Sequence, residues 1–325
     1  MKVLVAGGAG YIGSNMVRTL IDEKHEPVVF DNLSTGHREF VPKKTAFFKG
    51  DLKNIKDIQT VFKKYKIDAV MHFAASALVG ESVENPLKYY ENNVLASINL
   101  LKVMKAHQVS FFIFSSTCAT YGEPKRIPIL DDDEQNPVNP YGWSKLMIEK
   151  ILADLSKNGG IRYVALRYFN ACGAHPSAEI GERHDPEAHL IPNILKVVSG
   201  EKPQLMIFGD DYDTPDGTCI RDYVHIEDLA SAHLLALNAL RKGMPSNVFN
   251  LGSGNGYSVK EIVQVVERVT GKKVKFKICP RRPGDPPHLV AGAEKARKVL
   301  GWKPKHDLKS IITTAWRWEE KEAHR

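Results

Sequence analysis

A glycine-rich segment near the N-terminus restricts the fold of this chain more than any other feature. Gly7, Gly10 and Gly13 follow the apolar run Lys2–Ala6 and lead into a helical pattern over Tyr11–Asp22. Without a Cβ, the first glycine permits a tight turn, the second lets the backbone approach a pyrophosphate, and the third lets the helix pack closely on the strand. The positive end of the helix then faces the phosphates. The segment therefore predicts a strand, a turn and a helix that together bind a dinucleotide.

The first half of the chain alternates short apolar runs with helical patterns. Further strands are predicted at Pro27–Phe30, Thr45–Phe48, Asp68–Phe73, Ser110–Ser115 and Arg162–Leu166. Helices are predicted at Ile55–Tyr65, Leu87–Ala106 and Tyr141–Ser156. Such alternation is typical of βαβ units, which build a parallel sheet covered on both faces. We therefore predict an α/β fold, a Rossmann-type doubly wound parallel sheet with a smaller C-terminal α/β lobe.

After about Asn170 the pattern changes to loops and short elements, rich in Gly, Pro, Asp and His. Two later segments are predicted to return to the sheet and two to form helices of the smaller lobe: Arg221–Leu240 and Asn247–Leu251, then Ser258–Thr270 and Ala293–Leu300. We place the dinucleotide-binding domain at residues 1–169 and 226–251, and the substrate-binding lobe at residues 170–225 and 252–325.

The composition narrows the classes of partner. The 325 residues carry a formal net charge of +7, but lysines and arginines are dispersed, with a modest cluster only from Lys272 to Arg282. A small anionic substrate explains this charge better than nucleic acid does. No segment approaches the roughly 20 apolar residues of a membrane span, and the apolar run at the N-terminus is too short for a signal peptide. We expect a cytoplasmic protein with no membrane partner, whose four cysteines, lacking a CxxC pair, are reduced thiols.

An acidic residue at the end of the second predicted strand selects the cofactor. Asp31 lies about 20 residues past the glycines, where a carboxylate can bind the hydroxyls of the adenine ribose. Its charge would repel a 2′-phosphate, and Asn32 and Leu33 follow it without an arginine. We therefore predict NAD rather than NADP. A turn residue at a strand end is the alternative interpretation of Asp31.

Three residues form a candidate catalytic set. Tyr141 and Lys145 are four residues apart, so they share one face of the predicted helix. A neighbouring ammonium and the positive nicotinamide would lower the pKa of the phenol, which could then remove a proton from a sugar hydroxyl. Thr117 lies at the end of a strand, where parallel sheets bind ligands, and its hydroxyl could hydrogen-bond the reacting oxygen. Taken alone, the tyrosine and lysine could also meet by chance on an exposed helix face.

The glycine spacing, GxxGxxG, is similar to that of the extended branch of the short-chain dehydrogenase/reductase superfamily. Asp51, the run His72–Ala75 and Asn92 match positions that in this superfamily lie near the adenine, line the cofactor and hold it against the sheet. The residues expected to bind the cofactor are Gly7, Gly10, Tyr11, Ile12, Gly13, Asp31, Asn32, Leu33, Ser34, Thr35, Gly36, Asp51, Leu52, Phe73, Ala74, Ala75, Ser76, Ala77, Asn92, Thr117, Tyr141, Lys145 and Phe169.

Longer strings resemble the UDP-glucose 4-epimerase family along essentially the whole chain. They include GGAGYIGS (7–14), FIFSSTCATYG (112–122), PYGWSKLMIE (140–149), FGDDYDTPDGTCIRDYVHIEDL (208–229) and RRPGD (281–285). The resemblance implies that Tyr141 takes the proton of the 4-hydroxyl while hydride passes from C4 to NAD. The 4-keto sugar then turns about its link to the diphosphate, and the returning hydride inverts C4.

The same resemblance implies the contacts to a UDP-sugar. Phe169 is expected near the nicotinamide and Asn170 near the phosphates, while residues 205–208 are expected to line the uracil pocket. An arginine suits phosphate and a carboxylate suits ribose hydroxyls. The full set expected to bind substrate is Thr117, Tyr141, Asn170, His189, Leu190, Leu205, Met206, Ile207, Phe208, Arg221, Arg282, Asp285 and Leu289.

Several positions depart from the family pattern. His189 replaces a common asparagine, so its contact to the diphosphate is less secure, and Ala77 stands where some members have a lysine. The run Glu182–His189 contains residue types that bind metals, but its spacing matches no helix-borne ligand motif, so we predict a solvated loop and no metal.

Leu289 is intermediate in size between a bulky aromatic, which in this family narrows the sugar pocket, and a small residue, which admits an N-acetyl group. We therefore hypothesise that UDP-N-acetyl sugars are also accepted.

The residues around Thr117 and Tyr141 also bear on alternative functions. A 4,6-dehydratase or a glucuronate decarboxylase typically has a carboxylate just after the strand-end hydroxyl, but Thr117 is followed by Cys118 and Ala119. A 4-epimerase of UDP-glucuronate stays open, and a non-enzymatic NAD-binding scaffold would not need Tyr141 and Lys145. The family usually pairs two subunits through the helices at 87–106 and 141–157, so a homodimer is expected.

Overall fold

Seven parallel strands form the central sheet of the computed structural model, which describes residues 1–282 and 285–324. Their order across the sheet is β10-β6-β5-β4-β1-β2-β3. The strands are β1 (Lys2–Ala6), β2 (Glu26–Asp31), β3 (Ala46–Lys49), β4 (Ala69–His72), β5 (Phe111–Thr117), β6 (Arg162–Tyr168) and β10 (Asn247–Leu251). The order reverses between β1 and β4, so the carboxyl ends of these strands open a crevice there. The predicted doubly wound Rossmann-type sheet is confirmed.

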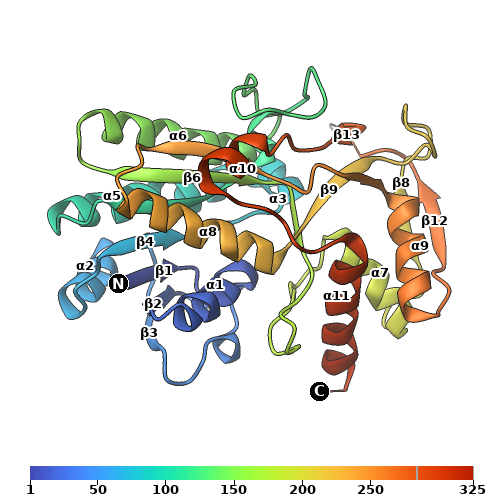
Figure 1. The fold of residues 1–325 in the computed structure, drawn as a ribbon. Coiled ribbons are helices and arrows are strands. Elements are labelled where there is room, and N and C mark those ends of the chain that lie inside the picture. Colours follow the sequence, from blue (N-terminus) through green and yellow to red (C-terminus); the bar gives the residue numbers. More distant parts are fainter. Residues whose placement is uncertain (283–284, 325) are drawn as a thin grey trace.

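Helices cover both faces of this sheet, as Figure 1 shows for α1 and α8 on the nearer face. One apolar core lies under α1 (Tyr11–Asp22), α8 (Ile226–Arg241) and α10 (Glu294–Leu300). A second core lies under α2 (Ile55–Lys64), α5 (Ala96–Ala106) and α6 (Pro140–Lys157) on the other face. Because both faces are covered, the strands are apolar along nearly their whole length rather than alternating with polar residues.

The single long helix predicted at 87–106 is wrong in its detail. The segment contains α4 (Pro86–Tyr89), a π-helical turn at Tyr90–Leu95 and then α5. A π turn inserts one residue into a helix and often marks a functional site. Here it turns Asn93 inward, where the side chain is 1% exposed. Sequence periodicity over 20 residues does not register one inserted residue, so the prediction missed it.

The smaller lobe lies at the opposite end of the molecule from α5 and α2 (Figure 1). A four-stranded sheet contains β7 (Asn170–Cys172), β9 (Ile220–His225), β11 (Gly256–Ser258) and β13 (His288–Leu289), and β8 (Leu205–Phe208) pairs with β12 (Phe276–Cys279). Helices α7 (Leu190–Ser199), α9 (Val259–Thr270) and α11 (Leu308–Ala323) enclose its core. The remaining elements are short: the helix α3 (Val79–Glu84) and the 3-10 helical turns Arg38–Phe40 and Cys118–Thr120.

The lobe boundaries stay a prediction, and one segment qualifies them. Ala293, Ala296, Leu300 and Trp302 are buried in the core beneath α1 and α8, not in that of the smaller lobe. Two residues of the RRPGD string, Pro283 and Gly284, lie outside the described residues.

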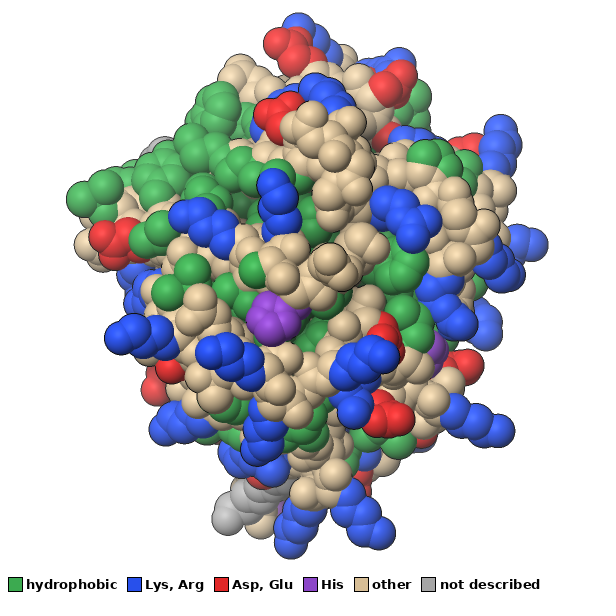
Figure 2. Space-filling view, turned by 90° about the vertical axis from the view of Figure 1, so that its left-hand side faces the viewer, with side chains coloured by type: hydrophobic (Ala, Val, Ile, Leu, Met, Phe, Trp, Pro, Cys, Tyr) green, Lys and Arg blue, Asp and Glu red, His purple; other side chains and the backbone are tan. Residues whose placement is uncertain are grey.

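The surface carries its basic residues in a dispersed pattern. Figure 2 shows lysine and arginine side chains scattered over the face drawn there, with hydrophobic side chains gathered at its upper left. Within residues 1–282 and 285–324, no helix is both long and apolar enough to cross a bilayer.

Candidate active site

The turn between β1 and α1 leaves an open cradle at the helix N-terminus. Gly7 has φ +78°, and a Cβ there would approach the backbone nitrogen of Ala74 to 2.5 Å. A Cβ on Gly13 would lie 2.1 Å from the carbonyl oxygen of Gly7, so helix and turn are in direct backbone contact. A Cβ on Gly10, in contrast, would meet only the Gly7 oxygen, at 3.4 Å, among the described residues. The fold itself requires glycine at 7 and 13, whereas the open space at Gly10 fits a pyrophosphate approaching the helix amides.

The end of β2 forms the second part of this cradle. Asp31 is buried, and its carboxylate accepts hydrogen bonds from the backbone N–H groups of Ala9 (2.9 Å) and Leu33 (2.8 Å). Burial raises the pKa of this carboxyl, against the opposing effect of the two amides. Asn32 donates to a carboxylate oxygen of Asp51 at 3.2 Å, which joins the loops after β2 and β3. The predicted cofactor-binding residues Asp31, Asn32, Leu33 and Asp51 are therefore brought to one edge of the cradle.

Asn93 positions the segment after β4, and no motif in the sequence indicated it. Its carboxamide oxygen accepts from the N–H of Ser76 (2.8 Å), and its nitrogen donates to the Ser76 carbonyl (3.0 Å) and the Ser144 hydroxyl (2.9 Å). The neighbouring Asn92, which was predicted, donates to the Ser76 hydroxyl at 3.1 Å. The π turn thus links the cofactor-lining residues 73–77 to α6, the helix that carries Tyr141 and Lys145.

Tyr141, Lys145 and Thr117 meet at the carboxyl end of β5. Thr117 is the last residue of that strand and is buried, and its hydroxyl accepts a hydrogen bond from the N–H of Ala119 at 3.1 Å. The ammonium nitrogen of Lys145 donates to the Ser115 carbonyl at 2.8 Å and lies 6.0 Å from the centre of the Tyr141 ring. The predicted catalytic set is therefore assembled beside the cradle.

Burial dominates the ionisation of this set in the ligand-free chain. It raises the pKa of Tyr141 to about 12, although the hydrogen bond with Thr117 opposes the shift. It lowers the pKa of Lys145 to about 7, although Glu149 one turn later on α6 opposes that shift. The enclosed site therefore disfavours both the phenolate and the ammonium. A cationic group bound beside Tyr141 would favour the phenolate.

Behind this set, α6 is fixed to the sheet by a buried ion pair that the sequence did not indicate. The carboxylate of Glu149 accepts from the guanidinium of Arg167 on β6 at 2.5 and 2.9 Å and from the Ser116 hydroxyl at 2.5 Å. The side chains of Glu149 and Arg167 are 4% and 5% exposed. Arg167 also donates to the Tyr121 hydroxyl at 2.7 Å, so its charge is fully enclosed by polar partners.

The proposed substrate residues lie where the smaller lobe meets the sheet. Asn170 donates to the backbone oxygen of Asp222 at 2.8 Å, and Arg221 forms an ion pair with Asp285. Leu289 is aligned with Arg221 across the β13–β9 pairing and packs with the cluster that includes Phe169. These residues surround the space next to the catalytic set from the side of the smaller lobe.

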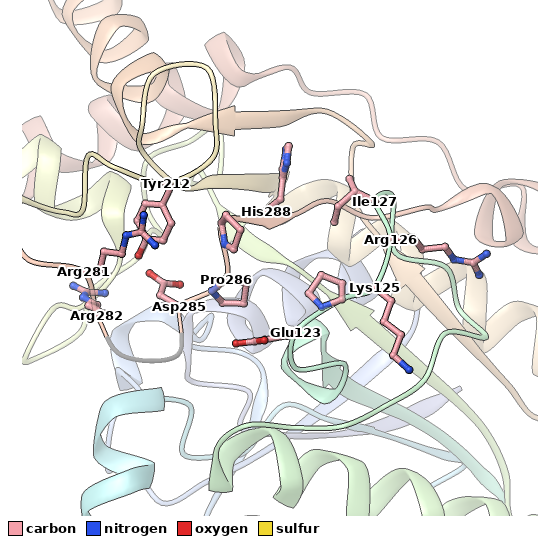
Figure 3. A pocket seen from close by; sticks show the side chains of 12 residues that line it. Glu123, Lys125, Arg126, Ile127, Tyr212, Arg281, Arg282, Asp285, Pro286 and His288 are labelled. Atoms are coloured by element: carbon pink, nitrogen blue, oxygen red, sulfur yellow. The ribbon is translucent and has the colours of Figure 1, made fainter.

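A cavity of about 750 Å³ opens beside them (Figure 3). Arg281, Arg282, Tyr212 and Asp285 lie on one side of it, and Glu123 comes from the loop after β5 (Figure 3). Lys125 and Arg126 also line it but are ion-paired with Glu134 and Asp133, and Arg281 is ion-paired with Asp211. Arg282 is therefore the basic residue of this lining that we expect to meet an anionic ligand.

Two of the predicted groups are not brought to this space as side chains. Leu205 and Ile207 are 4% and 2% exposed and belong to the core of the smaller lobe, because alternate residues of β8 face opposite sides. Only Met206 and Phe208 of that strand point out of the core, and the guanidinium of Arg282 lies 4.1 Å from the centre of the Phe208 ring. His189 precedes α7 and is packed against Glu182 and Glu187 instead of facing the cavity residues.

Known proteins resemble this chain over nearly its whole length. The NAD dependent epimerase/dehydratase family matches residues 3–252. A UDP-glucose 4-epimerase from Lactobacillus helveticus is 53% identical over 321 residues, which is 98% of this chain and 97% of the relative. This chain belongs to the UDP-glucose 4-epimerases. It is an NAD-dependent enzyme of the isomerase class, as the resemblance implied.

Solved structures of the family superpose on nearly the whole chain. A crystal structure of UDP-glucose 4-epimerase has a TM-score of 0.97 and 50% identity, covering 99% of this chain and 98% of that one. The Brucella ovis enzyme, crystallised in complex with NAD, has a TM-score of 0.95 and 49% identity, with 98% of each chain covered. Both lobes of this epimerase therefore share the family arrangement.

The two glycines of the cradle should respond differently to alanine. Gly13→Ala should destabilise the cofactor-free protein by about 3 kcal/mol, because its Cβ would overlap the backbone oxygen of Gly7. Gly10→Ala should change that stability by less than about 1 kcal/mol but weaken NAD binding at least about tenfold, since its methyl group occupies the open cradle. Urea unfolding and titration with NAD measure the two effects. Equal losses of stability would contradict this account of the turn.

Proposed function

We propose that this enzyme interconverts UDP-glucose and UDP-galactose by inverting C4, with Tyr141, Lys145 and Thr117 as its catalytic residues. The observation that carries the proposal is the position of Tyr141 and Lys145 on α6 at the end of β5, where Thr117 ends the strand beside the NAD cradle. The residues after Thr117 are Cys118, Ala119 and Thr120, so no carboxylate is placed there for elimination chemistry. That arrangement supports oxidation and reduction at one carbon rather than loss of water.

Each residue of the set has a defined task. The Tyr141 phenolate removes the proton of the 4-hydroxyl and later returns it, while Thr117 hydrogen-bonds the reacting oxygen. NAD, when bound, accepts the hydride from C4, returns it, and brings a positive charge to the site. That charge lowers the pKa of Tyr141, and the Lys145 ammonium acts in the same direction when it is protonated. Gly7, Gly10, Gly13 and Asp31 hold the cofactor in the cradle.

The uridine diphosphate provides the anchor that inversion requires. Arg221 and Arg282 supply guanidinium groups for the diphosphate, and Asp285 supplies a carboxylate for the ribose hydroxyls. Asn170 completes the phosphate contacts from the side of the smaller lobe. With the diphosphate held, the keto sugar can turn within the site without leaving it, which keeps the second hydride transfer effectively intramolecular.

We also place the enzyme in the cytoplasm, a location that the free thiols of all four cysteines support.

Tyr141→Phe should abolish the interconversion while leaving NAD bound, because the ring still fills its place but no group removes the hydroxyl proton. The assay follows UDP-glucose formed from UDP-galactose without added NAD, and NAD content is measured after acid release. Wild type should turn over with no net accumulation of NADH. Tyr163→Phe, a buried tyrosine at the start of β6, is the matched control and should retain activity. Unchanged turnover in Tyr141→Phe would exclude this residue as the base.

We further propose that Leu289 admits UDP-N-acetyl sugars. Its side chain is only partly buried beside Phe169 and Arg221, so its size limits the space for a group on C2. Wild type should convert UDP-GalNAc as well as UDP-galactose. Leu289→Tyr should lower kcat/KM for UDP-GalNAc by about 100-fold and leave UDP-galactose turnover within a few-fold. No conversion of UDP-GalNAc by wild type at high enzyme concentration would refute the hypothesis.

A homodimer through α3, α4, the π turn and α6 is our proposal for the assembly. These elements pack together, and they carry large apolar residues that are exposed. The exposed fractions are 64% for Val83, 73% for Leu87, 47% for Leu95, 39% for Trp143 and 40% for Met147. An apolar surface of this kind is typical of an interface, and one shared by two copies can close by two-fold symmetry.

Light scattering tests this assembly. Wild type should have twice the mass of the chain, and Leu87→Asp combined with Leu95→Asp should have the monomer mass, because two buried carboxylates would oppose association. Val299→Asp, which changes an apolar residue of similar exposure on α10, should remain dimeric. A monomeric wild type, or loss of the dimer in Val299→Asp, would contradict the proposed interface.

A further inference from the structure

Four side chains from the segment before α7 converge on one point. Glu182, His184, Glu187 and His189 each offer one ligand atom, and these atoms all lie within 4.8 Å of one another. The Nδ1 atom of His189 is 2.9 Å from a carboxylate oxygen of Glu182 and 2.9 Å from one of Glu187. The Nδ1 atom of His184 is 3.5 Å and 3.6 Å from oxygens of the same two carboxylates. The segment is a loop, as predicted, and the side chain of His189 is 46% exposed, but those of Glu182 and Glu187 are only 8% and 2% exposed.

The spacing of these atoms is that of a tetrahedral metal site. Zinc binds histidine nitrogen at about 2.0–2.1 Å and carboxylate oxygen at about 2.0–2.2 Å. Tetrahedral ligands at those bond lengths lie about 3.3–3.6 Å apart, by geometry. The four nitrogen-to-oxygen distances, 2.9, 2.9, 3.5 and 3.6 Å, bracket this range, with Glu187 facing His189 through Oε1 and His184 through Oε2. Small shifts of the side chains would therefore bring all four atoms to an ion at their centre.

Hydrogen bonding within the cluster leaves one buried atom unsatisfied. The Nδ1 atom of His184 is buried and has no hydrogen-bond partner among the described residues. It nevertheless points toward the two carboxylates, whose side chains are only 8% and 2% exposed. A buried polar nitrogen without a partner is costly, and two neighbouring buried carboxylates require positive charge. A cation at the centre of the cluster would meet both needs.

The charges of the cluster lead to the same result. Oxygens of the two carboxylates lie within 3.6 Å of the Nδ1 atoms of both histidines. Two nearly enclosed carboxylates create a local demand for a cation, which one divalent metal ion at the centre of the cluster can satisfy.

We propose that Glu182, His184, Glu187 and His189 bind a zinc ion as a closed, structural, tetrahedral site. Two imidazoles with two carboxylates form a donor set that zinc accepts, whereas Mg²⁺ and Ca²⁺ prefer oxygen ligands alone. A second group, His225, Glu227 and His306, is weaker because Nδ1 of His225 already accepts the N–H of Glu227 at 3.1 Å. That group serves as an internal control.

The position of the site gives the ion a structural task. The ring of His184 meets the ring of Tyr11 edge to face, with 6.4 Å between ring centres, and Tyr11 is the first residue of α1 beside the glycine turn. His189 is the residue that precedes α7. The zinc ion would therefore fix the loop that joins the NAD cradle to the N-terminus of α7. It would also hold His189 through Nδ1 and leave Nε2 as the free donor of that ring.

Zinc content and affinity test the proposal on the full-length enzyme with any affinity tag removed. Wild type dialysed against metal-free buffer with one equivalent of zinc should retain about one zinc ion per chain, measured by mass spectrometry of the metal. Competition with a chromophoric chelator should show at least about 100-fold weaker binding in His184→Gln and in Glu187→Gln. His306→Gln, which alters the second group only, should bind zinc like wild type. Circular dichroism and NAD content identify folded variants, and either cluster variant suffices if the other fails to fold.

Cobalt and heat provide readouts that an ion-pair cluster would not produce. Co²⁺ bound to the apo-enzyme should give the intense visible absorption of a tetrahedral site in wild type and His306→Gln, and lose it in Glu187→Gln. Zinc should raise the thermal midpoint of wild type but not of His184→Gln. Wild type that binds no zinc at one equivalent, or His306→Gln that loses it, would overturn the proposal. Zinc bound equally by wild type and both cluster variants would overturn it as well.

Discussion

The buried ion pair between Glu149 and Arg167 sets the position of the catalytic helix on the sheet. Breaking such a pair leaves an unpaired charge in the interior, which costs about 3–5 kcal/mol, so α6 is held to one register against β5 and β6. Lys145 lies one turn before Glu149, and Tyr141 lies two turns before it. The reach of both side chains to the end of β5 therefore depends on a contact that takes no part in the chemistry. The hydrogen bond from Ser116 to Glu149 ties the same carboxylate to the strand that ends in Thr117.

This rigid placement explains the electrostatics of the site. Lys145 and Tyr141 are enclosed so completely that burial disfavours the charged form of each, with pKa values of about 7 and about 12. The protein supplies little charge of its own at the point of reaction, because Glu149 is already paired with Arg167. The positive charge that makes Tyr141 a base must then arrive in part with NAD. Proton transfer is thereby coupled to the presence of the oxidised cofactor, which suits a reaction that ends with NAD unchanged.

The sequence predicted the parts of this molecule that depend on local pattern. Gly7, Gly13 and the Tyr141–Lys145 pair lie within single turns or helix faces, so spacing alone indicated them. The role of Asn93 was not predicted, because its inward direction depends on a π turn and hydrophobic periodicity does not reveal such a turn. The partners Glu149 and Arg167 escaped for a different reason, since 18 residues separate them and only the packing of α6 on β6 brings them together. Pairing between residues far apart in the sequence depends on the fold, so no single segment of the sequence predicts it.

The segment between β7 and α7 shows why long-range contacts matter for function too. Its Arg183 forms ion pairs with Glu39 near the cofactor cradle and with Glu322 on α11, and its backbone oxygen accepts from the ring of His37 at 3.1 Å. These contacts tie the smaller lobe to the loop after β2, which borders the cofactor cradle. A zinc ion held by Glu182, His184, Glu187 and His189 would stiffen that junction without contacting the reacting carbon. Since hydride transfer needs reacting atoms about 3–3.5 Å apart, a stiffer junction between the two lobes would help to keep the sugar carbon and the cofactor within that distance.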